Sequence, residues 1–416
     1  MRSSPFWIIL FAVMVLLDLY VFQVIKVLAQ GAGPKTRTIV FGIYWSLSIL
    51  ALITLILLPY INWDNMPRGL RNSIFAMIVA LFFAKLIAGV FFLIDDIRRV
   101  IQWAAGKVFF RNTEGEELQQ GVQISRSLFL SWMGVAVGST LFGSLLYGLS
   151  NKYNYRIKKL SLSFSNLPAA FKGLRVVQIS DIHSGSFTDK AAVNHGIDKA
   201  LALKPDLILF TGDLVNNTSD EMKDYMDVFS RLKAPMGVYS VLGNHDYGDY
   251  VQWPTPEAKV QNLERLKQIH GELGWKLLLN ENVILEKNGE MIAVLGVENW
   301  SSKARFPKYG ILSKAYAGTE TIPFKILMSH DPSHWEAEVL PKYKDIDLML
   351  AGHTHGMQFG VEVPRLKWSP VQYVYKQWAG IYKNQQQKLY VNRGFGFLGY
   401  PGRVGILPEI TLFELV

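Results

Sequence analysis

Five short apolar runs between residues 174 and 358, each followed by side chains that can bind metal ions, most constrain the fold of this chain. The runs end at Asp181-Ile182-His183, Gly212-Asp213, Gly243-Asn244-His245-Asp246, Ser329-His330-Asp331 and Gly352-His353-Thr354-His355-Gly356. A short apolar run bounded by glycine and polar residues predicts a buried strand. Ligands gather at the carboxyl ends of strands in open α/β sheets. Asp and His together suit two divalent first-row metals, about 3.5–4 Å apart. The pattern predicts a two-metal hydrolase site.

The same region alternates these strands with amphipathic segments, which predicts a layered α/β core. We expect helices at about Thr188–Leu203, Asp220–Lys233 and Glu257–Leu273, and further strands at Arg156–Phe164, Lys388–Asn392 and Glu409–Leu415.

Taken in order, the motifs D-x-H, G-D-x-x-N, G-N-H-D, a later single His and G-H-x-H resemble those of the calcineurin-like metallophosphoesterases. The resemblance covers about residues 155–416. It implies two packed mixed β-sheets flanked by helices, and a hydrolase that cleaves phosphoester or pyrophosphate bonds with two divalent metal ions. The identity of the metals stays open among manganese, iron, zinc and magnesium.

The resemblance also implies a role for each motif residue. The first metal would take Asp181, His183, Asp213 and His355, and the second would take Asp213, Asn244, His330 and His353. Asp213 would therefore bridge the two metals.

His245 would meet the phosphate beside Asn244 and protonate the leaving oxygen, a role that suits an imidazole. Asn216 stands where many relatives carry an Asp that orients this histidine, so the sequence leaves open how His245 is held. Arg393 has two interpretations: a contact to the substrate phosphate or a structural salt bridge. The aromatic run Trp368–Tyr382 is either a lipid-facing rim or a packed cap.

Four long apolar stretches precede this domain, at about Phe6–Leu28, Thr38–Ile61, Ser73–Ile94 and Leu128–Leu149. Each approaches or exceeds the roughly 20 residues that a helix needs to cross about 30 Å of hydrocarbon. The sequence therefore predicts an α-helical transmembrane domain of four helices over residues 1–150, followed by the metallophosphoesterase domain over residues 151–416. The basic, aromatic segment Arg98–Arg126 is either an interfacial segment or an ordinary loop.

Two ionisable residues lie near the middles of the first and third apolar stretches, Asp18 and Lys85. A lone charge at the centre of a bilayer costs about 2.5–3.5 kcal/mol on insertion scales, so charges there usually pair. We expect an ion pair between them; the alternative is that each snorkels or faces water.

The sequence barely determines on which side of the membrane the catalytic domain lies. Seven Lys and Arg residues lie on the side of the membrane where the catalytic domain lies, and eight lie on the opposite side. The positive-inside rule therefore does not decide the orientation. Because Lys152, Lys158 and Lys159 cluster just after the last apolar stretch, we favour a cytoplasmic domain.

The partners we expect are membrane lipids and a phosphoester substrate, which is either lipid-linked or soluble. The net charge of +9 is too mild to predict nucleic-acid binding, and nothing indicates an oligomeric state. Two other classes of function remain: a non-catalytic metal-binding sensor coupled to the helices, and a transporter with a regulatory domain. The complete set of predicted metal ligands disfavours the sensor. The transporter is supported only by the charged pair of Asp18 and Lys85.

Overall fold

The computed structural model describes residues 5–57, 60, 66–109, 126–364 and 366–416. The chain divides into two compact units, Met1–Tyr147 and Gly148–Val416.

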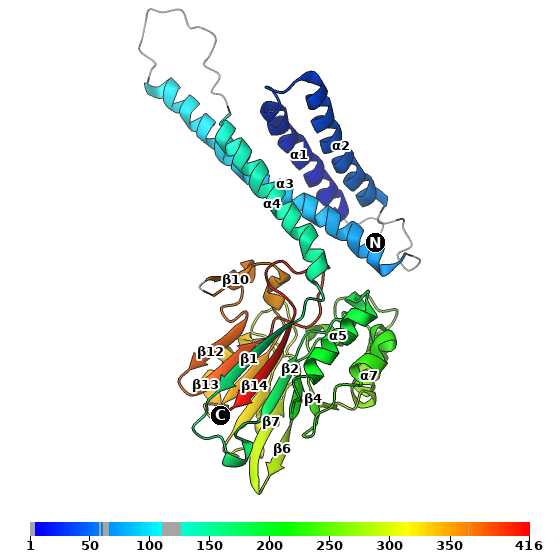
Figure 1. The fold of residues 1–416 in the computed structure, drawn as a ribbon, viewed down its shortest axis with the longest axis vertical. Helices are drawn as coiled ribbons and strands as arrows, with labels where there is room; N and C mark the ends of the chain where they lie inside the picture. The colour runs from blue at the N-terminus through cyan, green and yellow to red at the C-terminus, as the bar shows by residue number, and fades with distance from the viewer. Residues whose placement is uncertain (1–4, 58–59, 61–65, 110–125, 365) are drawn as a thin grey trace, which may run out of the picture. The chain divides into compact units, whose positions relative to one another are not determined.

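The first unit consists of long helices (Figure 1). They are α1 (Pro5–Leu28), α2 (Pro34–Leu57), α3 (Arg68–Phe109) and α4 (Leu128–Gly148). Within the described residues, these four are long and apolar enough to cross a membrane, which confirms the predicted transmembrane helices.

The third helix is longer than its apolar stretch predicted, because it continues past Arg98 to Phe109. Ion pairs one turn apart, Asp95 with Arg98 and Asp96 with Arg99, support helical structure beyond the apolar part. Up to Phe109 the predicted interfacial segment or loop is therefore a helical extension. The rest of that segment, residues 110–125, lies outside the described residues.

Small residues allow α3 and α4 to approach closely. A Cβ atom added to Gly138 would lie 2.7 Å from the main-chain oxygen of Ala84, and one added to Gly134 would lie 3.0 Å from that of Ala88. Helices in membranes commonly associate through such small residues four positions apart.

The predicted ion pair between Asp18 and Lys85 is confirmed. The Lys85 Nζ donates to Asp18 Oδ1, and also to Ser48 Oγ at 2.7 Å. Ser48 in turn donates to Asp18 Oδ1 at 3.0 Å. All three side chains are buried, so the pair joins α1 and α3 and includes α2 through Ser48.

The second unit contains two six-stranded mixed sheets among the described residues, which confirms the predicted fold class. The first sheet has the order β1-β14-β2-β3-β4-β5 and the second β12-β13-β9-β8-β7-β6. The first comprises β1 (Arg156–Leu162), β14 (Glu409–Leu415), β2 (Arg175–Ile179), β3 (Leu207–Phe210), β4 (Val238–Ser240) and β5 (Lys276–Leu277). The second comprises β12 (Gly380–Asn384), β13 (Gln387–Val391), β9 (Leu348–Ala351), β8 (Lys325–Met328), β7 (Glu290–Gly296) and β6 (Glu281–Lys287).

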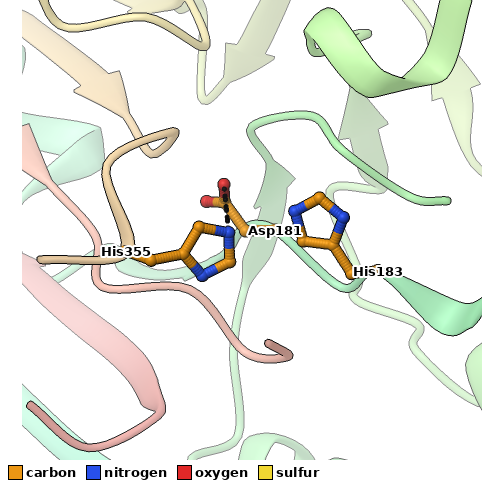
Figure 2. Close-up of side chains that lie close together, drawn as sticks. All are labelled: Asp181, His183 and His355. Carbon is orange, nitrogen blue, oxygen red and sulfur yellow. Dashed lines mark ion pairs between the residues drawn. The ribbon is translucent and has the colours of Figure 1, made fainter. Parts of the chain in front are cut away.

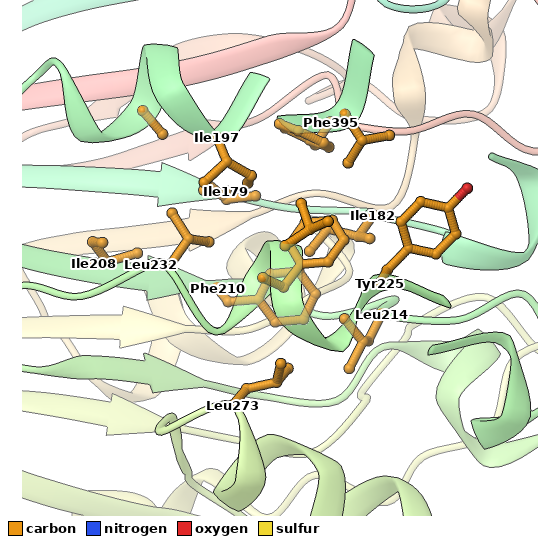
Figure 3. Close-up of a cluster of buried hydrophobic side chains, with 14 of the residues drawn as sticks. Ile179, Ile182, Ile197, Ile208, Phe210, Leu214, Tyr225, Leu232, Leu273 and Phe395 are labelled. Atoms are coloured by element: carbon orange, nitrogen blue, oxygen red, sulfur yellow. The ribbon is translucent and has the colours of Figure 1, made fainter. Parts of the chain in front are cut away.

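The sheets pack face to face and helices cover their outer faces. One buried cluster lies between the sheets and includes Val176 and Leu209 from the first and Ile326 and Leu350 from the second. A second cluster fills the outer face of the first sheet under α5 (Lys190–Leu201), α6 (Met226–Phe229) and α7 (Pro256–Glu272) (Figure 3). The outer face of the second sheet packs on α8 (Leu312–Tyr316) and α9 (Leu340–Lys342).

A third ribbon, separate from both sheets, is the hairpin of β10 (Val361–Val363) and β11 (Leu366–Trp368). The sequence did not predict this hairpin. The predicted helix over Asp220–Lys233 is wrong in its type, because Ser219–Tyr225 forms a 3₁₀ helix and only Met226–Phe229 is α-helical.

Candidate metal centre

The seven residues that the sequence predicted as metal ligands all follow the carboxyl ends of central strands. The strands β2, β3 and β4 of the first sheet and β8 and β9 of the second run into these loops. Several of the residues have positive φ, which a residue other than glycine rarely adopts; they are Asp181 (52°), His183 (50°), Asp213 (60°), His353 (72°) and His355 (50°). Such strained positions cluster at functional sites.

A first group brings together Asp181, His183 and His355, whose potential ligand atoms lie within 4.8 Å of one another (Figure 2). The Nε2 atom of His355 is 3.3 Å from Asp181 Oδ1. Neither ring nitrogen of His183 has a hydrogen-bond partner, although the ring is buried. Burial lowers the pKa of His183 to about 3, so this imidazole is neutral at pH 7. Its unprotonated nitrogen has a lone pair that accepts no hydrogen bond from the described residues.

Asp213 lies between this group and a second one. Its Oδ2 atom is 3.5 Å from the Nε2 of His183 and 3.1 Å from the Nε2 of His330. Its Oδ1 atom accepts the backbone N–H of His245 at 2.9 Å. One carboxylate therefore faces the histidines of both groups, as the bridging ligand of a two-metal site must.

His330 and His353 turn ring nitrogens toward the same place. The Nδ1 atom of His330 donates to the main-chain oxygen of Thr211 at 2.8 Å, which leaves Nε2 facing Asp213. Tyr375 donates its hydroxyl to Asp331 at 3.1 Å, so that hydroxyl accepts from the Nε2 of His353 at 2.9 Å. The Nδ1 of His353 is then unprotonated.

Asn244 completes the second group. Its Nδ2 donates to the Tyr250 hydroxyl at 2.8 Å, and its Oδ1 lies 2.8 Å from the Nδ1 of His353. That Nδ1 is also 3.3 Å from the Nε2 of His330. Acceptors that face one another this closely, beside the Asp213 carboxylate, need a positive charge among them.

The charge balance supports this interpretation. Burial acts to lower the pKa of His330, but the carboxylates of Asp213 and Asp181 raise it to about 10. Without a cation, a proton on His330 thus supplies the positive charge, and a bound cation would take its place. Oxygen and imidazole donors of this kind suit divalent first-row metals. The residues present fit a pair of such cations.

His355 fits less directly than the other predicted ligands. Its Nδ1 lies 3.2 Å from an Nη2 of the buried Arg403. A guanidinium can only donate, so the neutral ring carries its proton on Nε2, toward Asp181. For His355 to offer Nε2 to a metal, the contact with Arg403 has to open.

His245 is held by backbone groups. Its Nδ1 donates to the main-chain oxygen of Asn216 at 2.8 Å, while the Asn216 side chain bonds instead to Ser186. The Nε2 atom of His245 has no hydrogen bond to any described residue. This answers the question that the sequence left open, because Asn216 positions the ring through its backbone and needs no side-chain carboxylate for it.

Asp246, next in the chain, supports the loops rather than the metal group. Its carboxylate accepts the backbone N–H groups of Gly243, Asp213, Leu214 and Val215 at 2.8–3.2 Å. It therefore ties the loop after β3 to the loop after β4.

The structure supports the interpretation of Arg393 as part of a structural salt bridge. Its Nε and Nη2 atoms donate to Glu362 at 2.9 and 2.7 Å, and its Nη1 donates to Glu409. With the side chain buried and the guanidinium shared between two carboxylates, the predicted contact to substrate phosphate has no support in this geometry.

Several supporting residues escaped the sequence analysis. Tyr375 and Asp331 hold His353, and Tyr250 holds Asn244. The loop from Trp300 to Gly310 also borders the second group, because the ring of Phe306 lies 4.8 Å from that of His353. Asp331 lies in the motif Ser329-His330-Asp331 and Tyr375 in the aromatic run, but neither pattern indicates that these residues hold His353.

The aromatic run Trp368–Tyr382 divides between its two interpretations. Tyr375 and Trp378 are buried in a small cluster with Val371 and Ile406, as a packed cap requires. Tyr373 is exposed.

Comparisons with solved structures give low similarity. The NAD nucleotidase of Haemophilus influenzae shares 19% identity over 55% of this chain and 45% of that chain, with a TM-score of 0.38. The phosphopantetheinyl hydrolase of Mycobacterium tuberculosis shares 16% identity over 55% of this chain and 91% of that chain, with a TM-score of 0.31.

Curated relatives are similar at 26–28% identity. A "Transmembrane protein with metallophosphoesterase domain" of Danio rerio is 26% identical over 64% of this chain and 59% of its own length. The "Uncharacterized metallophosphoesterase YkuE" of Bacillus subtilis is 27% identical over 70% of this chain and 98% of its own. The "UDP-2,3-diacylglucosamine pyrophosphatase LpxG" of Chlamydia muridarum is 28% identical over 59% of this chain and 86% of its own.

Two family models match successive parts of the chain. Residues 1–152 match "Probable Calcineurin-like phosphoesterase, transmembrane domain", and residues 174–357 match "Calcineurin-like phosphoesterase". The first match makes the chain a membrane protein, and the second contains all seven predicted ligands and His245. The chain therefore belongs to the calcineurin-like phosphoesterases that carry an N-terminal transmembrane domain.

Proposed function

We propose that this protein is a membrane-anchored, metal-dependent phosphoesterase that hydrolyses phosphoester or pyrophosphate bonds. The observation that carries the proposal is the position of Asp213, whose Oδ2 faces His183 at 3.5 Å and His330 at 3.1 Å. A carboxylate shared by two groups of potential metal ligands is the arrangement that two-metal hydrolysis uses. When bound, two divalent cations neutralise phosphate charge and lower the pKa of the attacking water.

The side chains divide the remaining work. Asp181, His183, Asp213 and His355 would hold one cation, and Asp213, Asn244, His330 and His353 the other. Asn244 adds an oxygen ligand without negative charge, which leaves its cation more attractive to an anionic substrate. Tyr375 and Asp331 keep the proton of His353 on Nε2, so that its Nδ1 stays available.

His245 would act as the general acid. In its protonated form, the ring keeps its Nδ1 proton on the oxygen of Asn216 and presents a second proton on Nε2, which has no described partner. That proton can pass to the oxygen of the leaving group as the phosphorus–oxygen bond breaks.

We infer further that the substrate is lipid-linked and that the catalytic domain is cytoplasmic. The four apolar helices and the similarity to LpxG, a UDP-2,3-diacylglucosamine pyrophosphatase, support the first inference. The cluster of Lys152, Lys158 and Lys159 after the last span supports the second. Because the chain has no cysteine, labelling of Val260→Cys by a membrane-impermeant maleimide tests the side: a cytoplasmic domain is labelled only after lysis.

The activity is tested with purified full-length protein. Wild type and Asp213→Asn are compared for bound divalent metal and for hydrolysis of bis(p-nitrophenyl) phosphate, with the exposed Asp227→Asn as the control for loss of a carboxylate. Loss of metal and of rate in Asp213→Asn alone supports the proposal, whereas equal rates in all three proteins contradict it. Release of phosphate from detergent-solubilised phospholipids and from water-soluble esters then separates the substrate classes.

A further inference from the structure

The hairpin of β10 and β11 presents an apolar face that the described residues do not cover. Side chains alternate between the two faces of a strand, and the hairpin pairs Val361 with Trp368 and Val363 with Leu366. These four lie on one face. Val361 is 42% exposed, Val363 53% and Leu366 54%, while Trp368 is partly exposed.

The opposite face fixes the hairpin to its unit. Glu362 accepts two hydrogen bonds from Arg393 and a further one from Lys158. Lys367, paired with Glu362 across the hairpin, donates to the main-chain oxygen of Ala379. The buried Arg393 therefore anchors a ribbon whose apolar face points away from the domain.

One side chain after the hairpin enlarges the apolar face. Tyr373 is 76% exposed. Trp368 donates its indole N–H to the Tyr373 hydroxyl at 3.4 Å. Contiguous exposed apolar surface of this kind marks a site of interaction, and Tyr and Trp are enriched where proteins meet the membrane–water interface.

The hairpin also lies beside the point where the chain leaves its last apolar span. That span runs from Leu128 to Asn151. The main-chain oxygen of Gly148, the first residue of the second unit, accepts the N–H of Arg403 at 2.9 Å. The next residue, Val404, exchanges backbone hydrogen bonds with Gln358 and Gly360 at 2.8 and 2.9 Å. Neighbouring strands lie about 4.8 Å apart, so Val361 begins roughly two strand spacings from Gly148, which lies in the last turn of the span.

We propose that the face formed by Val361, Val363, Leu366, Trp368 and Tyr373 docks on the lipid bilayer that α1 to α4 cross. A surface so close to the end of a membrane span meets lipid headgroups before any soluble partner. Its composition, aliphatic side chains with aromatic rings that carry a polar atom, matches an interfacial segment.

This docking face is continuous with the loop that carries two of the metal ligands, His353 and His355. Ser369, directly after β11, donates its hydroxyl to the main-chain oxygen of Gly356 at 2.8 Å. Thr354 donates to the main-chain oxygen of Trp378 at 2.6 Å. If the proposed hydrolysis holds, on which this step rests, the substrate is a phosphate or pyrophosphate ester whose lipid tail stays in the bilayer during the reaction.

The docking is tested by measuring the depth of single spin labels. The chain contains no cysteine, so Val363→Cys can be labelled alone in the full-length protein, reconstituted in vesicles of phosphatidylethanolamine and phosphatidylglycerol. Met291→Cys, at a 42% exposed apolar position on β7, is the matched control. We expect the Val363 label to have a several-fold higher ratio of oxygen to nickel-chelate accessibility than the Met291 label.

Two results overturn the proposal. Equal high accessibility to both reagents at the two positions means that the hairpin faces water. Low accessibility to both reagents at position 363 means that a protein covers it.

A second measurement connects docking to substrate. Val363→Asp should lower the ratio of hydrolysis of a vesicle-embedded phospholipid to hydrolysis of bis(p-nitrophenyl) phosphate at least several-fold, and Met291→Asp should leave this ratio unchanged. An unchanged ratio in Val363→Asp overturns delivery of substrate from the bilayer. A lipid-immersed label in a protein that hydrolyses no phosphoester would instead sustain the docking and defeat the proposed function.

Discussion

At the scale of single residues, the backbone does much of the positioning in this site. Main-chain oxygens of Asn216 and Thr211 fix the proton positions of His245 and His330, and the backbone N–H of His245 binds Asp213. Such contacts persist when side chains change, which explains how an asparagine can replace an aspartate at position 216. The His245 ring itself is not among the predicted metal ligands.

Replacement of His245 by alanine should therefore slow hydrolysis without loss of metal. General acid catalysis contributes about 10²–10⁴-fold to a rate, so we expect a loss of this order for alkyl phosphoesters. The loss should be much smaller for p-nitrophenyl esters, whose leaving group departs without a proton. Steady-state kinetics on both substrates, with metal analysis of each protein, check this; equal losses on both would argue against the acid role.

Tyr375 should matter for metal binding although it contacts no cation itself. Its hydroxyl links His353 to Asp331, and loss of an outer hydrogen bond to a metal-binding histidine typically costs about 10–100-fold in affinity. We expect Tyr375→Phe to weaken metal binding by this factor, measured by titration of the metal-free protein. Tyr373→Phe, in the same segment but exposed, is the control and should bind metal as the wild type does.

The sequence predicted the seven candidate ligands because each follows a buried strand, and the pattern of such strands is local. It could not assign supporting roles to Tyr375, Asp331 or Arg403, whose partners lie far away in the chain. Nor could it decide the role of Arg393. That required the two carboxylates, Glu362 and Glu409, which reach it only in the folded protein.

At the scale of elements, long apolar helices and central strands were predictable from composition and length, while short or extended elements were not. The strand at residues 361–363 is too short to give an alternating pattern, so β10 and β11 went unnoticed. The extension of α3 to Phe109 went unnoticed because the apolar run ends near Ile94, and the ion pairs that follow it, Asp95 with Arg98 and Asp96 with Arg99, form no apolar pattern.

The contact of Asp18 with Lys85 predicts an asymmetric response to mutation. Removal of one partner leaves the other charge buried among helices, at a cost of about 2.5–3.5 kcal/mol on insertion scales. Asp18→Asn or Lys85→Met alone should lower the yield of membrane-inserted protein more than the double variant does. Quantitative immunoblots of isolated membranes measure this, and purely additive losses would show that the two residues act independently.

At the scale of the whole molecule, the proposed cations join two sheets. Three ligand loops leave β2, β3 and β4 of one sheet, and two leave β8 and β9 of the other. Metal binding should therefore stabilise the packing of one sheet on the other, and not only complete a reaction centre.

Chelation should lower the unfolding temperature of the detergent-solubilised protein. A ligand present at 100 times its dissociation constant stabilises the folded state by about 2.7 kcal/mol, which corresponds to roughly 5–11 °C for a unit of this size. Intrinsic tryptophan fluorescence during heating, with and without EDTA, measures the shift. The unfolding temperature of Asp213→Asn should change little on chelation. An unchanged unfolding temperature of the wild type would contradict the proposal that the cations stabilise the packing of the two sheets.

The position of β14 has a consequence for biosynthesis. This strand lies between β1 and β2, parallel to the first and antiparallel to the second, so β1 joins the sheet only through it. Until the ribosome has synthesised the residues from Glu409 onward, β1 has no strand to pair with and one edge of β2 is unpaired. The nascent domain would therefore remain unfinished long after its helices have entered the membrane, and would be vulnerable to aggregation until that strand is inserted.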